Sequence, residues 1–148
     1  MEIKGPWTRS QIDDFLEETR APIRLAVNGR SGHPVVAPLW FLPLEGRLWC
    51  ATQQTAGLVS ILNRDPRCAF EVSVETPPYC GVRGPALATL HEDRAEEILG
   101  ALVDRHVGRR DTPFSRYLLE RVDREVAIEI APREVTSWDY RERMGERE

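Results

Sequence analysis

The chain has 148 residues, which suits one domain with a single core, and its net charge of −4 excludes a strongly basic nucleic-acid binder. No apolar run approaches the roughly 20 residues that cross a bilayer, and residues 1–6 lack the apolar core of a signal peptide. We therefore expect one cytoplasmic domain over residues 1–148.

Helical and strand patterns follow one another along the chain. Thr8 and Gln11 form a capping-box pattern that starts a first helix, which ends before Pro22. Residues 28–32 are turn formers between two apolar segments, which predicts a β-hairpin. In chain order, the predicted elements are a helix from Thr8, strands over 23–27, 34–41 and 47–52, a helix over 55–63, strands over 68–74 and 83–90, helices over 92–107 and 114–122, a strand over 125–131, and an extended or irregular segment over 134–140.

The strands are short and are joined mostly by turns, which predicts antiparallel pairing. In the strand 47–52, alternation places Leu48, Cys50 and Thr52 on one face and Trp49 and Ala51 on the other. Six short strands suit a small barrel, which removes exposed sheet edges by closing on itself. The sequence therefore predicts a mainly β (α+β) domain with short flanking helices.

The residue types that carry metal or hydrolytic chemistry are scattered. The cysteines form no CxxC pair, which argues against a disulfide framework or a zinc site. We expect Cys50 and Cys68, within apolar runs, to be core thiols and Cys80, among turn residues, to be exposed. None of the histidines has a second ligand at metal-binding spacing, so we expect structural or solvated roles for His33, His91 and His106.

Polar residues gather between the strand 47–52 and the helix that follows it. Thr52, Gln53, Gln54 and Thr55 lie near the helix N-terminus, where they could receive an anion such as a phosphate. The alternative is that Thr55 simply caps the helix. Arg83, beside a glycine on the fifth strand, could pair with an acidic group of a ligand or form a surface ion pair.

The order and spacing of these segments resembles the pyridoxamine 5'-phosphate oxidase-like family. The resemblance is closest to its small bacterial members, which bind FMN or the deazaflavin coenzyme F-420. It spans nearly the whole chain, although each matching stretch is short. The stretches are residues 15–16, 23–27, 32–41, 46–52, 62–67, 78–84 and 137–140.

The resemblance implies a six-stranded antiparallel split β-barrel and a homodimer with two cofactor sites at its interface. The isoalloxazine ring would lie against Ala37, Pro38, Leu39, Trp40 and Ala51. The cofactor phosphate would lie near Thr52, Gln53, Gln54 and Thr55. The partner subunit would close the pocket, with Tyr79, Arg83 and Trp138 as the candidates by position.

One stretch departs from the family. Its short helix usually begins with a serine, an arginine or a similar residue, and a lysine that meets the phosphate, whereas this chain has Ala56, Gly57 and Leu58. Losing that lysine removes a charge-assisted bond worth about 1.5–3 kcal/mol. Substituting Leu58→Lys would test this placement of the phosphate.

The resemblance leaves three functions open. The first is an FMN- or deazaflavin-dependent oxidoreductase of unknown substrate, in which the cofactor carries the hydride chemistry and no catalytic side chain is required. The second is a non-catalytic module that holds a flavin, a deazaflavin such as F-420, or haem. The third is a structural dimer without a ligand.

Overall fold

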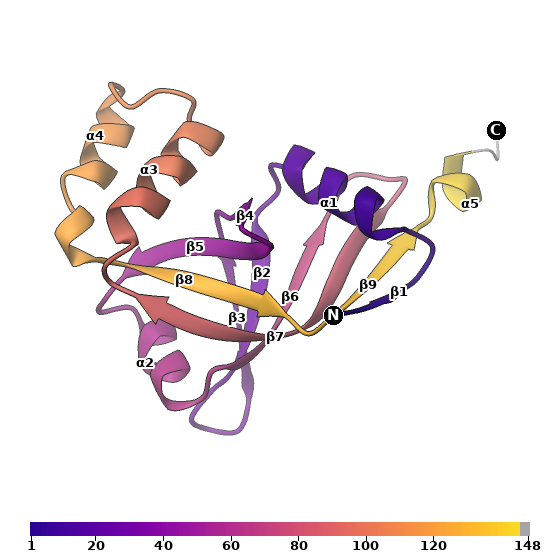
Figure 1. The fold of residues 1–148 in the computed structure, drawn as a ribbon, viewed down its shortest axis with the longest axis horizontal. Coiled ribbons are helices and arrows are strands. Elements are labelled where there is room, and N and C mark those ends of the chain that lie inside the picture. The colour runs from indigo at the N-terminus through magenta and orange to yellow at the C-terminus, as the bar shows by residue number, and fades with distance from the viewer. Residues whose placement is uncertain (146–148) are drawn as a thin grey trace.

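The computed structural model describes residues 1–145, which form a nine-stranded sheet with helices around it (Figure 1). The strands are β1 (Glu2–Lys4), β2 (Ile23–Asn28), β3 (Pro34–Leu39), β4 (Leu42–Leu44), β5 (Arg47–Gln53), β6 (Arg67–Ser73), β7 (Cys80–His91), β8 (Glu125–Pro132) and β9 (Glu134–Asp139). The helices are α1 (Arg9–Glu18), α2 (Gly57–Arg64), α3 (Ala95–His106), α4 (Pro113–Leu119) and α5 (Arg141–Gly145), with a short 3-10 helix at Val122–Arg124.

Strand β7 is the branch point of the sheet. The strands pair in the order β3-β2-β6-β7-β8-β5-β4, all antiparallel, while β9 also pairs with β7 and carries β1 beside it. Residues 80–83 of β7 pair with β9 and residues 86–91 pair with β8. Between them, the Cβ position of Gly84 faces the backbone carbonyl of Glu134 so closely that a side chain does not fit. The sheet splits there and curls into a half-open barrel.

The sheet buries both of its faces where β5 and β8 run side by side. Leu48 and Cys50 belong to the large cluster inside the barrel, together with Ile128 and Ile130 of β8. Trp49 belongs to a second cluster on the outer face. There it packs with Ala127 of β8 and with Ile98 and Leu102 of α3. The predicted alternation along β5 is confirmed, and it explains how α3 is held on the outside of the barrel.

The structure adds three strands to the six that the sequence predicted. β1 and β4 have three residues each, which is too short to show an alternating pattern. β9 covers the segment predicted as extended or irregular, and it is a full ladder partner of β7. The mainly β architecture is confirmed, and the pairing of the described strands is antiparallel as predicted except between β1 and β9, which are parallel.

The cysteines are all buried. This confirms the prediction for Cys50 and Cys68, and burial raises the pKa of the Cys68 thiol to about 11. The prediction that Cys80 is exposed is wrong. Its turn-like neighbours precede the strand, whereas Cys80 itself opens β7 and pairs with Asp139 of β9.

Helix α1 begins with the predicted capping box. The Gln11 backbone N–H donates to the Thr8 hydroxyl at 3.2 Å, and the Thr8 backbone N–H donates to the Gln11 side-chain oxygen at 2.8 Å. The alternative role considered for Thr55 does not hold. The N-cap residue of α2 is Ala56, and no side chain caps that helix.

Substituting Thr8→Ala should lower the free energy of unfolding by about 1 kcal/mol, because one N–H group at the start of α1 loses its acceptor. The matched control is Thr55→Ala, which removes an exposed threonine that caps nothing and should change stability by less than about 0.5 kcal/mol. Urea unfolding followed by circular dichroism measures both. Equal losses in the two variants would contradict the assignment of the caps.

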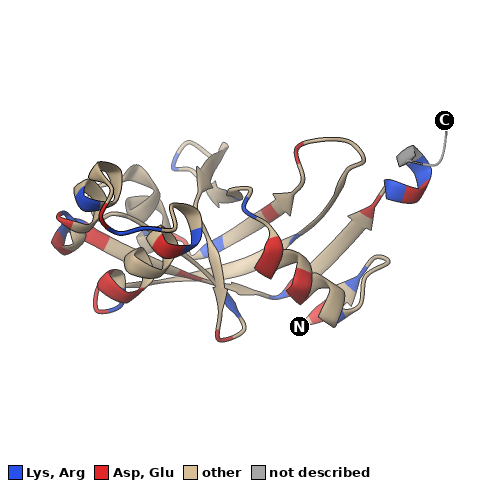
Figure 2. Ribbon diagram, turned by 90° about the horizontal axis from the view of Figure 1, so that it is seen from above, with Lys and Arg blue, Asp and Glu red and all other residues tan. Residues whose placement is uncertain are grey.

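Charged residues lie mainly on the helices and the connecting turns, and the strands carry few of them (Figure 2). Within residues 1–145, no helix has both the length and the apolar character that a membrane span requires. The same residues contain no group of three or more His, Cys, Asp or Glu side chains arranged to hold a metal ion.

Candidate functional site

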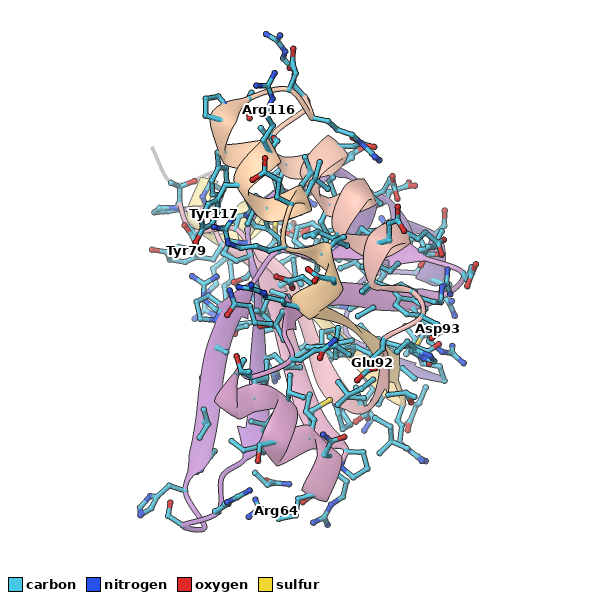
Figure 3. All side chains as sticks on the ribbon, turned by 90° about the vertical axis from the view of Figure 1, so that its left-hand side faces the viewer. Arg64, Tyr79, Glu92, Asp93, Arg116 and Tyr117 are labelled. Carbon is cyan, nitrogen blue, oxygen red and sulfur yellow. The ribbon has the colours of Figure 1, made fainter. Side chains whose placement is uncertain are left out.

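A groove of about 350 Å³ runs over the outer face of the barrel, where the ends of β3 and β5 meet α3 and α4. Figure 3 views this side, with Arg116 and Tyr117 marking α4 above and Arg64 marking the end of α2 below. The groove is lined mostly by apolar side chains. The lining residues are Pro38, Leu39, Trp40, Ala51, Thr52, Gln53, Leu99, Leu102, Phe114, Leu118 and Glu125.

The strands β5 and β8 form the floor of the groove. Their register pairs Ala51 with Ala127 and Gln53 with Glu125. Because side chains alternate along a strand, these four residues share the outer face that carries Trp49. Ala51 lines the groove, and its small side chain leaves the floor low at this point, whereas Ala127 is fully buried beneath it.

Aromatic rings form one wall. The Trp40 ring stacks on the His106 ring with centroids 5.0 Å apart and planes 8° apart, and it meets the Phe114 ring edge-on at 5.9 Å. His106 Nε2 lies 3.1 Å from the Phe41 carbonyl, and burial lowers the pKa of His106. The neutral His106 ring therefore supports Trp40 from behind, which fits the structural role expected for it. Phe114 is about half exposed, so it offers an open aromatic face.

The other two histidines fit the same expectation. His33 is exposed in the β2–β3 turn. His91 is half-buried at the end of β7, where its Nε2 lies 3.3 Å from the Glu129 carboxylate. Neither of them lines the groove.

Half of the predicted site residues come together in the groove. Pro38, Leu39, Trp40, Ala51, Thr52 and Gln53 line it, so the structure joins the expected ring-binding strands with the start of the expected phosphate site. Ala37 lies on β3 beside them without lining the groove, and Thr55 is exposed in the turn before α2.

Gln54 forms two hydrogen bonds to the backbone at the start of β8. Its side-chain amide donates to the backbone carbonyl of Glu125 at 3.1 Å, and its backbone N–H donates to the carbonyl of Arg124 at 2.8 Å. Both bonds tie the end of β5 to the start of β8. Gln54 therefore shapes the end of the groove rather than lining it.

Ala56, Gly57 and Leu58, where this chain departs from the family, lie at the start of α2 and differ in how closely they are packed. The Ala56 backbone N–H donates to the Gln53 carbonyl at 3.0 Å, so the helix begins one tight turn beyond the groove. Gly57 is exposed, and open space surrounds the position of a Cβ atom there. Leu58 packs against the barrel core. A cation that reached a phosphate from this helix would fit at position 57 without loss of packing.

The remaining predicted residues lie apart from the groove, on the β7–β9 side of the sheet. The Arg83 guanidinium stacks over the Trp138 ring at 5.3 Å, and Trp138 pairs with Gly81 in the ladder. Tyr79 is exposed in the loop before β7. Arg83 forms no ion pair with a described residue, so the surface ion pair considered for it is absent from residues 1–145.

Sequence reasoning missed the helical wall and one acidic residue. The apolar stripe of α3 and the pattern of α4 predicted helices, but not that Leu99, Leu102, Phe114 and Leu118 would face β5. Glu125 carried a signal of its own, because it is a charged residue at the head of a strand whose remaining positions are mostly buried. Burial raises the pKa of the Glu125 carboxyl.

A second recess of about 250 Å³ lies between α1 and the β4–β5 turn. Its rim carries exposed charged residues of both signs, including Arg9, Asp13 and Arg47, and Arg9 and Asp13 pair with each other at 3.2 Å. No residue predicted for a cofactor lies in this recess.

No family model and no curated protein matches the chain, but solved structures share its fold. A conserved hypothetical protein of Mycobacterium tuberculosis, Rv2991, is 24% identical with a TM-score of 0.80, covering 92% of this chain and 87% of that one. An F420 reductase is 22% identical with a TM-score of 0.66, covering 82% and 94%.

Two further structures extend the range of that likeness. A Listeria innocua protein named as a candidate pyridoxamine 5'-phosphate oxidase is 17% identical with a TM-score of 0.65, covering 86% of this chain and 95% of that one. HutZ, the haem storage protein of Vibrio cholerae, is 16% identical with a TM-score of 0.65, covering 86% and 92%. This chain therefore has the split-barrel fold of the pyridoxamine 5'-phosphate oxidase-like proteins.

Proposed function

We propose that the groove binds a flavin-type cofactor, with FMN as the leading candidate, and that the protein is an oxidoreductase. One observation carries the proposal. Six residues that the family resemblance places at a flavin line one groove in the structure, although they come from β3, β5 and the segment after β3. The groove's volume of about 350 Å³ and its apolar lining are typical of small-molecule sites.

The chain's own residues would position the ligand and exclude water from it. Ala51 gives a low floor, Trp40 and Phe114 give aromatic contacts, and Gln53 and Thr52 give polar groups at one end. A bound flavin supplies the hydride chemistry, so no acidic or basic catalytic side chain is required. We assign no catalytic residue.

The deazaflavin coenzyme F-420 is the second candidate, because an F420 reductase shares the fold. Haem is a weaker candidate than either flavin-type cofactor, although the haem storage protein HutZ shares the fold too. Among the described residues that line the groove there is no His, Cys, Met or Tyr to serve as an axial ligand of haem iron.

We also propose that the protein works as a homodimer. β3 lies at one end of the strand order, and Val35 and Val36 are 41% and 63% exposed on it. An apolar edge strand of this kind favours pairing with a second chain. Tyr79, Arg83 and Trp138 lie away from the groove of their own protomer, so they could close a groove only in a second copy.

The function is tested by spectrum and turnover. Protein incubated with FMN or F-420 and then desalted should retain the visible absorption of the cofactor. An oxidoreductase should then pass electrons from a nicotinamide donor to an artificial acceptor. Retained colour without turnover would support the non-catalytic binding module, and a colourless protein would support the structural dimer without a ligand.

The departure at α2 gives a prediction about the phosphate. Gly57→Lys should tighten FMN binding about 10-fold, because it adds a cation near the helix N-terminus where the structure leaves open space. Riboflavin, which has no phosphate, is the matched control and should bind with unchanged affinity. Fluorescence titration measures both, and equal effects on the two ligands would place the phosphate elsewhere.

A further inference from the structure

Glu125 is a largely buried residue whose carboxylate has no hydrogen-bond or ion-pair partner among the described residues. It is the first residue of β8 and is 8% exposed. Within residues 1–143, no side chain or backbone group forms an ion pair or a hydrogen bond with its carboxylate. Glu129, four residues along the same strand, shows the contrast, because its carboxylate lies 3.3 Å from His91.

The side chain of Glu125 belongs to the groove. The register pairs it with Gln53, and alternation places it on the outer face together with Ala127. That face forms the groove floor, and Glu125 is among the lining residues. The carboxylate therefore stands at the polar end of an apolar groove.

The backbone around Glu125 is held in place from β5. The Gln54 side-chain amide donates to the Glu125 carbonyl at 3.1 Å, and the Gln54 backbone N–H donates to the Arg124 carbonyl at 2.8 Å. Two bonds on adjacent carbonyls fix where β8 begins. A recognition group must be positioned in this way before the ligand arrives.

Such a carboxylate disfavours the folded protein in the absence of a ligand. Burial without a cation penalises the charged form, and removal from water is compensated only by a hydrogen-bond donor. Buried polar groups in proteins nearly always have such a donor. The missing donor is therefore expected from the molecule that occupies the groove.

We propose that Glu125 determines the specificity of the groove by accepting a hydrogen bond from a ring N–H group of a planar heteroaromatic ligand. This inference rests on the proposed function, since flavin and deazaflavin rings both carry an imide N–H at one edge.

The test compares riboflavin with 3-methylriboflavin, in which a methyl group replaces the imide hydrogen. The protein variants are Glu125→Leu, which removes the acceptor, Glu125→Gln, which keeps a neutral acceptor, and Glu129→Gln as the matched control on the same strand. Fluorescence titration gives the affinities, and circular dichroism melting of the ligand-free proteins shows whether each variant folds.

The wild type and Glu129→Gln should bind riboflavin about 10-fold more tightly than 3-methylriboflavin. Glu125→Leu should bind both ligands equally, with Glu125→Gln between these limits, and both Glu125 variants should melt at a higher temperature than the wild type. Flavin binding with no preference for riboflavin, or with a preference that Glu125→Leu retains, would overturn this inference alone. A wild type that binds neither ligand would overturn the proposed function and this inference together.

Discussion

Replacing Trp49 by alanine should lower the free energy of unfolding by about 3–5 kcal/mol, the largest loss expected from a single substitution discussed for this protein. Trp49 is fully buried between the β5–β8 layer and α3. Its indole N–H donates to the Leu44 carbonyl at 3.1 Å, and the Arg94 guanidinium lies 4.4 Å from the ring centroid. The substitution removes the ring, the hydrogen bond and the cation–π contact at once.

The loss should be measured by urea unfolding followed in the far ultraviolet, because tryptophan fluorescence changes with the substitution itself. Trp138→Ala is the control, since Trp138 is only half-buried and contacts one cation, Arg83. Trp138→Ala should lower the free energy of unfolding by clearly less than Trp49→Ala does. Equal losses of unfolding free energy in the two variants would mean that the packing of Trp49 between α3 and β5 is not a major source of stability.

Substituting Val36→Glu should convert the proposed dimer to monomers. Val36 is 63% exposed in the middle of an edge strand, and a charge placed there would be buried without a partner on association. Because the proposed cofactor site is completed by a second copy, flavin binding should fall by 10-fold or more in the same variant.

Analytical ultracentrifugation measures the change in mass. Ser10→Glu is the matched control, because it adds the same charge at an exposed position in the first turn of α1, where a negative charge is favourable. It should leave the mass unchanged. A wild type that sediments as a monomer would contradict the dimer, as would a Val36→Glu variant that keeps the mass of two chains.

The parts of the fold that follow local rules could be predicted from the sequence. Thr8 and Gln11 are a capping box with a fixed spacing, and the alternation of Leu48, Trp49 and Cys50 separates the two faces of β5. β1 and β4 were missed because three residues show no period. Cys80 was misplaced because turn formers precede it, whereas pairing with Asp139, 59 residues away, decides its burial.

The groove was predictable only on its strand side. Pro38, Trp40 and Ala51 followed from the resemblance to the pyridoxamine 5'-phosphate oxidase-like family. The wall from α3 and α4 depends on how helices at residues 95–119 pack on strands at residues 38–53, and no local pattern encodes that contact. Glu125 could not be distinguished from an ordinary surface carboxylate by sequence alone. Both its low exposure and its lack of a partner are visible only in the structure.

The most direct test of the central claim is an equilibrium titration of the wild type and Ala51→Phe with FMN. Ala51 lies on the groove floor, and a phenyl ring there occupies the space assigned to the cofactor ring. The wild type should bind one FMN per protomer, and Ala51→Phe should lose that binding while keeping its circular dichroism spectrum. Wild-type protein that binds no FMN, or a folded Ala51→Phe variant that binds it as tightly, would contradict the account of this groove as a flavin site.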